Sequence, residues 1–139
     1  MTKMDVYYLG NLRCSARHMS SNAELLTDAP RDNQGLGSSF SPTDLLATAL
    51  LTCMQTLMGI TARSRGWDLD GMNGSVSKEM SSEGARRVAR LIIDLHIPGE
   101  WEPHDRAILE QAARSCPVAK SLSPEIEQVV RFSYGLKTP

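Results

Sequence analysis

The sequence predicts an α+β fold with an antiparallel sheet. Three observations lead to this: a long apolar helical segment near the middle of the chain, strand-like segments on both sides of it, and two further helical segments before a last strand. This chain order, in which strands come before a long helix and further strands, helices and a last strand follow it, is typical of an α+β layout. The length of 139 residues suits one domain, so residues 1–139 are expected to form a single domain.

The N-terminal part is expected to form short strands. Residues 5–28 alternate apolar and polar side chains, with a turn at Gly10 and Asn11, and residues 23–27 form the last strand of the set. Residues 28–41 are rich in Pro, Gly and Ser, which indicates a loop.

The strongest helix is predicted to begin after Ser41. Ser41 can cap it, Pro42 suits the first helical position, and Asp44 stands three residues after Ser41, as in a capping box. The helix should run to Arg65 and end at Gly66. At 1.5 Å per residue it would be roughly 35 Å long.

One face of this helix is apolar at a spacing of three or four residues. Further apolar side chains widen that face, so the helix is expected to be central. The predicted face consists of Leu46, Ala49, Leu50, Cys53, Leu57 and Ile60.

The C-terminal half should return to strands. Two strands are predicted at residues 68–80 and 86–97, followed by a helix at 103–115. A short helix should start at Cys116 and run to Leu122, and residues 125–134 should form the last strand.

Charge and composition exclude several classes of partner. The formal net charge is −1 and no polybasic run occurs, which disfavours nucleic acid and anionic membranes as partners. The N-terminus lacks the pattern of a signal peptide, and the longest apolar run, at residues 45–51, is short for a membrane span. A cytoplasmic location is therefore expected, where three cysteines do not indicate a structural disulfide framework.

Metal and cofactor sites are not expected. The three histidines are scattered, and the chain has neither a C-x-x-C nor an H-x-x-x-H motif. Signatures of serine hydrolases and phosphate-binding loops are also missing from the sequence.

Thiol chemistry is the remaining candidate. Cys53 lies mid-helix, where a cysteine is often only packed, and it would need a nearby cation to ionise. Cys116 precedes Pro117 at a helix start, where backbone N–H groups favour a thiolate. Cys14, next to Arg13 in a predicted strand, is interpreted as incidental. The residues alone thus indicate an α+β cytosolic domain with candidate thiol chemistry.

Two motifs carry a family resemblance. They are residues 40–54, which contain Pro-Thr-Asp-Leu followed by Cys53, and the triplet Cys116-Pro117-Val118. Together they resemble the OsmC/Ohr family of osmotically induced and organic hydroperoxide resistance proteins. Residues 27–30 and 78–80 look like the OsmC-like subgroup. The resemblance implies an OsmC-like fold, in which an antiparallel sheet wraps a long central helix and two chains form an intertwined homodimer with sites at their interface.

The resemblance also implies a reaction. Cys53 would be the peroxidatic thiol and Cys116 the resolving one, with an organic hydroperoxide as substrate and a thiol or dithiol as reductant. The implied function is a thiol-dependent peroxidase without a cofactor. The alternative is an OsmC-like protein with little turnover that binds a small apolar ligand or responds to redox state.

The family's arginine and acid have less direct counterparts here. Arg13 is the best match for the arginine, with Arg17 and Arg31 as rivals. Family members of the Ohr type place a glutamate ten residues before the reactive cysteine, where this chain has Thr43, and the acid here is Asp44, nine residues before. Asp44 either holds the arginine or only caps the helix.

Overall fold

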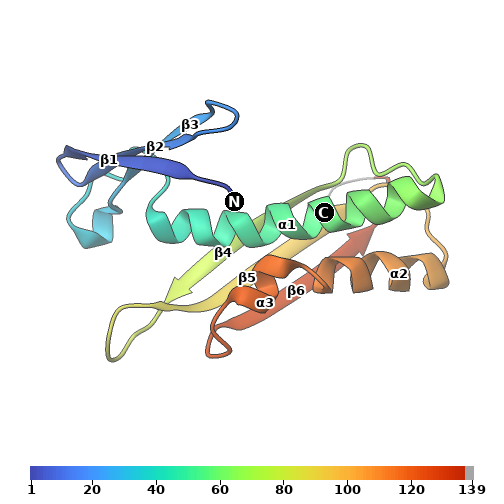
Figure 1. The fold of residues 1–139 in the computed structure, drawn as a ribbon. Coiled ribbons are helices and arrows are strands. Elements are labelled where there is room, and N and C mark those ends of the chain that lie inside the picture. Colours follow the sequence, from blue (N-terminus) through green and yellow to red (C-terminus); the bar gives the residue numbers. More distant parts are fainter. Residues whose placement is uncertain (137–139) are drawn as a thin grey trace. The chain divides into compact units, whose positions relative to one another are not determined.

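The computed structural model describes residues 1–136, and the chain divides into two compact units, Met1–Leu46 and Ala47–Pro139. The long helix α1, Pro42–Arg65, begins in the first unit and continues through the second. Figure 1 shows the order of the elements along the chain. Strands occur on both sides of α1 in the sequence, which confirms the predicted α+β class.

The first unit contains a three-stranded antiparallel sheet. Its strands are β1, Met4–Gly10, β2, Arg13–His18, and β3, Glu24–Asp28, in the order β1-β2-β3. The tight β1–β2 turn places Asn11 and Leu12 at positive φ, 55° and 63°. A short 3-10 helix, Arg31–Asn33, interrupts the segment predicted as a loop.

The predicted ends of α1 agree with the structure. The Ser41 backbone N–H donates to Asp44 Oδ2 at 2.8 Å, and the Asp44 N–H donates to Ser41 Oγ at 3.1 Å, which makes a reciprocal capping box. At the other end Gly66 has φ of +70°, and the Trp67 N–H bonds the Ala62 carbonyl at 2.9 Å. This is a Schellman motif, which a glycine in the left-handed region permits.

The second unit contains a mixed sheet, which corrects the prediction of an antiparallel sheet. Its strands are β4, Asn73–Met80, β5, Val88–Ile97, and β6, Glu127–Tyr134, in the order β4-β5-β6. β4 runs antiparallel to β5, whereas β6 runs parallel to it. A parallel pair needs a long crossover, and α2, Pro103–Arg114, and α3, Pro117–Ser121, lie in the connection from β5 to β6.

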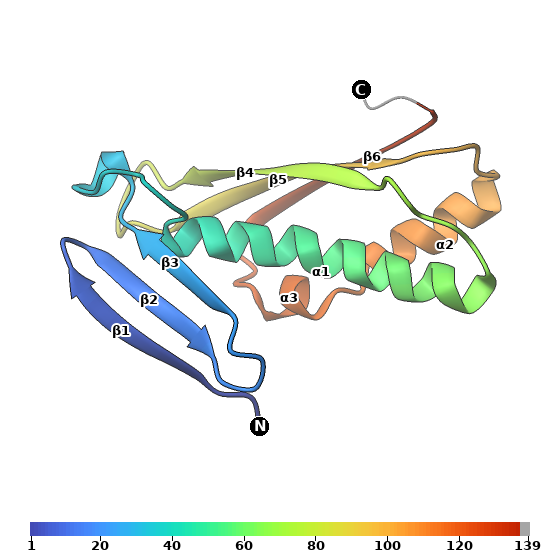
Figure 2. The same ribbon diagram turned by 90° about the horizontal axis from the view of Figure 1, so that it is seen from above.

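The helices of the second unit cover one face of this sheet, as Figure 2 shows from above. Alternate side chains of β5 are fully buried there, because successive residues of a strand point to opposite faces. The buried core of this unit includes Leu91, Ile93, Leu95 and Ile97 of β5, Leu50, Met54 and Met58 of α1, and Leu109 of α2.

The buried face of α1 is not the predicted one. Leu50 belongs to both faces, but the other buried residues are Ala47, Leu51, Met54, Met58 and Ala62. The remaining predicted residues are half-buried or exposed, and Ile60 is 58% exposed. The helix is apolar on nearly every side, so residue spacing alone did not select the side that packs on the sheet.

The α1 helix is long enough to cross a membrane, and its most apolar window has a mean hydropathy of 1.6. The apolar run at residues 45–51 alone is shorter than a membrane span. A third of the most apolar window, 33%, is buried within the protein. The Leu50 and Met54 side chains of that helix are 0% and 1% exposed. Length and hydropathy alone do not distinguish a membrane span from the core helix of a globular protein.

Replacing Ser41 with alanine should lower the free energy of unfolding by about 1–2 kcal/mol, since it removes the acceptor for the Asp44 N–H. Urea unfolding followed by circular dichroism measures this loss. Ser64→Ala is the control, because it deletes an exposed hydroxyl near the other end of α1 and should cost less than about 0.5 kcal/mol. Equal losses in both variants would contradict the capping role.

Candidate functional site

Two of the predicted site residues, Cys53 and Cys116, lie together in the second unit. Cys53 stands on α1, Cys116 is the N-cap residue of α3, and their thiols are hydrogen-bonded to each other. Both are free thiols. The fold thus joins two sulfurs that are 63 positions apart in the sequence.

The two thiols differ in their access to solvent. Cys116 is completely buried, with 0% exposure, whereas Cys53 is half-buried. A reagent from solution therefore reaches Cys53 more readily than Cys116, which has no exposed surface. An asymmetric pair of this kind suits a reaction in which one sulfur meets the reagent and the other responds to it.

The surroundings of Cys116 favour its protonated form. Burial is the largest cause that raises the pKa of the Cys116 thiol, and the hydrogen bond with Cys53 raises it further, as expected when Cys116 is the donor. Backbone N–H groups of Ala119, at 3.3 Å from the sulfur, and of Val118 act in the opposite direction. The net result is that Cys116 holds its proton and offers it to Cys53.

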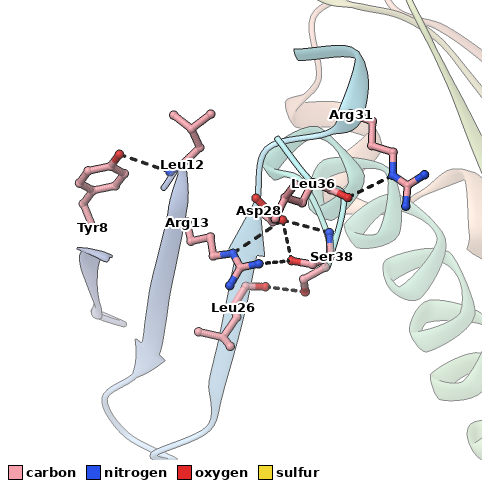
Figure 3. Close-up of polar contacts among 9 residues, drawn as sticks. Tyr8, Leu12, Arg13, Leu26, Asp28, Arg31, Leu36 and Ser38 are labelled. Carbon is pink, nitrogen blue, oxygen red and sulfur yellow. Dashed lines mark hydrogen bonds and ion pairs between the residues drawn. The ribbon is translucent and has the colours of Figure 1, made fainter. Parts of the chain in front are cut away.

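Arg13 belongs to a polar cluster in the first unit, drawn in Figure 3. Arg13 on β2 stands directly opposite Asp28 on β3, and its Nε lies 3.7 Å from Asp28 Oδ2. Arg13 Nη2 donates to Ser38 Oγ at 3.0 Å. The Ser38 hydroxyl and backbone N–H both donate to Asp28 Oδ2, at 2.5 Å and 3.0 Å.

The Asp28 carboxyl is buried but ionised. Its side chain is 1% exposed, and the Ser38 hydroxyl followed by the Ser38 N–H lowers its pKa, with a smaller contribution from Arg13. Sequence analysis missed both Asp28 and Ser38. The signal available was a carboxylate at the end of an apolar strand, at a position predicted to start a loop.

The other predicted residues also have defined contacts. Asp44 accepts, among its contacts, the capping hydrogen bond described above. Arg17 Nη2 donates to Asn22 Oδ1 at 2.8 Å, and Arg31 Nε donates to the Leu36 carbonyl at 3.1 Å. Cys14 lies on β2 and is half-buried. Of the three candidate arginines, Arg13 is the one that an ion pair joins to a buried carboxylate.

The contacts of these residues fall into two groups. Cys53 and Cys116 meet in the second unit, and Arg13 meets Asp28 and Ser38 in the first. Among residues 1–136, no three His, Cys, Asp or Glu side chains gather in a way that could hold a metal ion.

Comparison with known proteins identifies the family. The family model for the OsmC-like protein matches residues 35–130. A crystal structure from Psychrobacter arcticus 273-4, of a protein whose name assigns it to osmotic stress induction and a detoxification response, is 46% identical. The alignment covers 95% of this chain and 96% of that one, with a TM-score of 0.90. The chain therefore belongs to the OsmC-like protein family.

More distant structures share the fold. An organic hydroperoxide resistance protein OsmC from Legionella pneumophila is 17% identical, with a TM-score of 0.73 over 98% of this chain and 97% of that one. An organic hydroperoxide resistance protein from Elizabethkingia anophelis is 16% identical, with a TM-score of 0.69 over 99% and 98%. No curated protein sequence matches this chain.

Buried Cys116 should make stability fall at high pH. Because its pKa is raised above the usual 9.0 in the folded state, its contribution is complete below about pH 9 and is lost as the pH rises through the folded pKa. The slope should reach at most about 1.4 kcal/mol per pH unit. Urea unfolding in the presence of a reductant, over the range from neutral to about pH 10.5, measures it.

Cys116→Ser is the comparison for this measurement and should show a shallower fall. Tyr134, whose pKa is also raised by burial, titrates in both proteins, so the difference isolates Cys116. Parallel curves for the two proteins would mean that Cys116 does not titrate differently in the folded and unfolded states.

Proposed function

We propose that this protein is a thiol-dependent peroxidase that reduces organic hydroperoxides, with Cys53 as the peroxidatic thiol and Cys116 as the resolving thiol. The observation that carries the proposal is the hydrogen bond between a half-buried and a fully buried sulfur. Membership of the OsmC-like family, and the organic hydroperoxide resistance proteins among the structures with this fold, support it.

In the first step the Cys53 thiolate attacks the outer oxygen of the hydroperoxide. A sulfur–oxygen bond forms, the O–O bond breaks, and Cys53 is oxidised to the sulfenic acid. The peroxide is reduced, and its alkoxide takes up a proton and leaves as the alcohol. The Cys116 thiol is protonated and hydrogen-bonded to Cys53, so it holds a proton beside the reacting sulfur.

In the second step the sulfur of Cys116 attacks the sulfenic sulfur. A disulfide forms, and the sulfenic oxygen leaves as water with the proton of Cys116. Two thiols at hydrogen-bonding range can join through local adjustment of the side chains. Two equivalents of an external thiol, or one dithiol, then reduce the disulfide and are themselves oxidised to a disulfide.

Arg13 supplies the cation in this proposal. A guanidinium keeps its charge at every physiological pH, so it can favour a thiolate and orient a peroxide oxygen. In the polar cluster, the residues that hold Arg13 are Asp28 and Ser38, and not Asp44. Asp44 is assigned to the cap of α1, where its carboxylate bonds the Ser41 N–H.

Steady-state turnover tests the proposal. Purified protein with cumene hydroperoxide and a dithiol should consume peroxide, and Cys53→Ser should reduce the rate to the background of the uncatalysed reaction. Cys116→Ser should still form one sulfenic acid per chain, trapped by dimedone, but should turn over more slowly because recycling lacks the internal thiol.

Cys14→Ser is the matched control and should retain the wild-type rate, since Cys14 lies on β2 outside the thiol pair. A wild-type rate in Cys53→Ser would refute the proposed peroxidase activity. Peroxide that leaves all three thiols intact would favour the alternative in which the protein binds a small apolar ligand.

The functional form proposed is a homodimer. The apolar face of α1 that includes Leu57 and Ile60 stays half-buried or exposed in the single chain. In the first unit, β1 also has exposed apolar side chains, which are Met4, Val6, Tyr7, Tyr8 and Leu9. Clustered exposed apolar side chains mark an interface more often than a solvated face.

Sedimentation equilibrium at micromolar concentration should give twice the subunit mass of 15.3 kDa. Ile60→Glu should shift the protein to the monomer, because it puts a charge on the exposed apolar face while leaving the buried face of α1 unchanged. Ser64→Glu, at an exposed polar position of the same helix, is the control and should remain a dimer. A monomeric wild type would contradict the proposed assembly.

A further inference from the structure

We infer that Gln128 on β6 is a positioning residue for the resolving thiol, because its side-chain amide holds α3 in place and thereby orients the Cys116 sulfur. The inference rests on the proposed function and concerns its second step. From the sequence, Gln128 is predicted only as part of the last strand, and neither cysteine motif includes it. Three features of the second unit support the role: the face of β6 on which Gln128 lies, the hydrogen bond that it makes, and the short length of α3.

Gln128 lies on the face of β6 that the helices cover. Its register partner on β5 is Leu91, a core residue with 0% exposure, and paired residues of neighbouring strands share a face. Tyr134 lies on the same face of β6, and its hydroxyl donates to Glu110 of α2 at 3.0 Å. A polar amide at a helix-facing position breaks the apolar pattern of a sheet packed against helices. Such exceptions are expected at functional or strained sites.

The Gln128 amide reaches α3 with a hydrogen bond. Its Nε2 donates to the Ala119 carbonyl at 3.3 Å, and α3 lies on the sheet face that α1 and α2 also cover, as Figure 2 shows. The backbone N–H of the same residue, Ala119, donates to Cys116 Sγ at 3.3 Å. Gln128 therefore holds, through its carbonyl, the residue whose N–H points at the resolving sulfur.

The α3 helix needs such an anchor because it is short. It has five residues, Pro117–Ser121, and an isolated helix of this length is not stable in water. The Ser121 hydroxyl donates to the Pro117 carbonyl, so this bond is internal to α3 and ties it to no other element. Among residues 1–136, Gln128 provides the side-chain hydrogen bond that joins α3 to the sheet.

The second step of the reaction depends on the direction of the Cys116 sulfur. In that step the S–S bond forms and the S–O bond of the sulfenic acid breaks, so Cys116 must approach Cys53 from the side opposite to the leaving oxygen. The two sulfurs start at hydrogen-bonding range, so the movement is short and orientation decides its rate. The Ala119 N–H also lowers the pKa of the Cys116 thiol, against the larger effect of burial, and so favours the thiolate that attacks.

Single-turnover kinetics separates the two steps. Reduced protein is mixed with one equivalent of cumene hydroperoxide and quenched at intervals, and mass spectrometry follows dimedone-trapped Cys53 and the disulfide between Cys53 and Cys116. In Gln128→Leu and Gln128→Glu, which lack the amide donor, disulfide formation should slow by about tenfold or more, because a small misplacement of a reacting group costs rate. Oxidation of Cys53 should keep its wild-type rate. Equal slowing of both steps, or an unchanged rate of disulfide formation, would overturn the inference.

Two variants control for side-chain size and packing. Gln111→Leu replaces an exposed glutamine of α2 and should change neither rate. Val130→Ala removes packing two residues further along the same face of β6, so it should lower the urea midpoint without slowing disulfide formation. If Val130→Ala slowed disulfide formation as much as Gln128→Leu does, the effect would come from packing and the inference would be overturned. Gln128→Glu, which keeps the shape of the side chain, gives the same decision if Gln128→Leu does not fold.

A second measurement does not depend on turnover. In ¹⁵N NMR spectra the Ala119 N–H, which bonds Cys116 Sγ, should exchange slowly with solvent in the wild type. In Gln128→Leu and Gln128→Glu it should exchange about tenfold faster or more, because the local opening of α3 becomes easier. Unchanged exchange in both variants would overturn the inference. If the wild type does not reduce hydroperoxides at all, the proposed function fails, while this exchange rate still decides whether Gln128 holds Ala119 at the sulfur.

Discussion

The contact between the Cys53 and Cys116 thiols is the interaction on which the proposed function depends. It exists because α1 lies on the β4-β5-β6 sheet and because the crossover from β5 to β6 brings the start of α3 to the same place. The core side chains of α1 and β5 hold these elements together. The same packing that stabilises the unit therefore sets the distance between the two sulfurs.

The two sulfurs have different environments. Burial raises the pKa of Cys116 and keeps its proton in place, whereas half-buried Cys53 can meet a molecule from solution. Before any substrate binds, Cys116 therefore holds the proton and Cys53 is the thiol that solvent can reach. In the proposed reaction the first oxidation occurs at Cys53, and the proton of Cys116 leaves with water when the disulfide closes.

Local signals in the sequence predicted local structure well. Ser41, Pro42, Asp44 and Gly66 located both ends of α1, because caps depend on a few neighbouring residues. Non-local pairing was harder to predict. The buried side of α1 was misassigned because the helix is apolar nearly all round. The sheet was predicted to be antiparallel, whereas the helices before β6 allow it to return parallel to β5. The thiol pair was proposed from motifs, but the Arg13–Asp28 pair depends on strand register, which no motif in the sequence encodes.

Peptide mapping after one equivalent of cumene hydroperoxide tests the central claim most directly. With the reductant removed, two thiols per chain should be lost, and mass spectrometry should find one disulfide-linked peptide that joins Cys53 to Cys116, while Cys14 stays reduced. Recovery of Cys53 and Cys116 as free thiols, or a disulfide that involves Cys14 instead, would contradict the redox role of the pair.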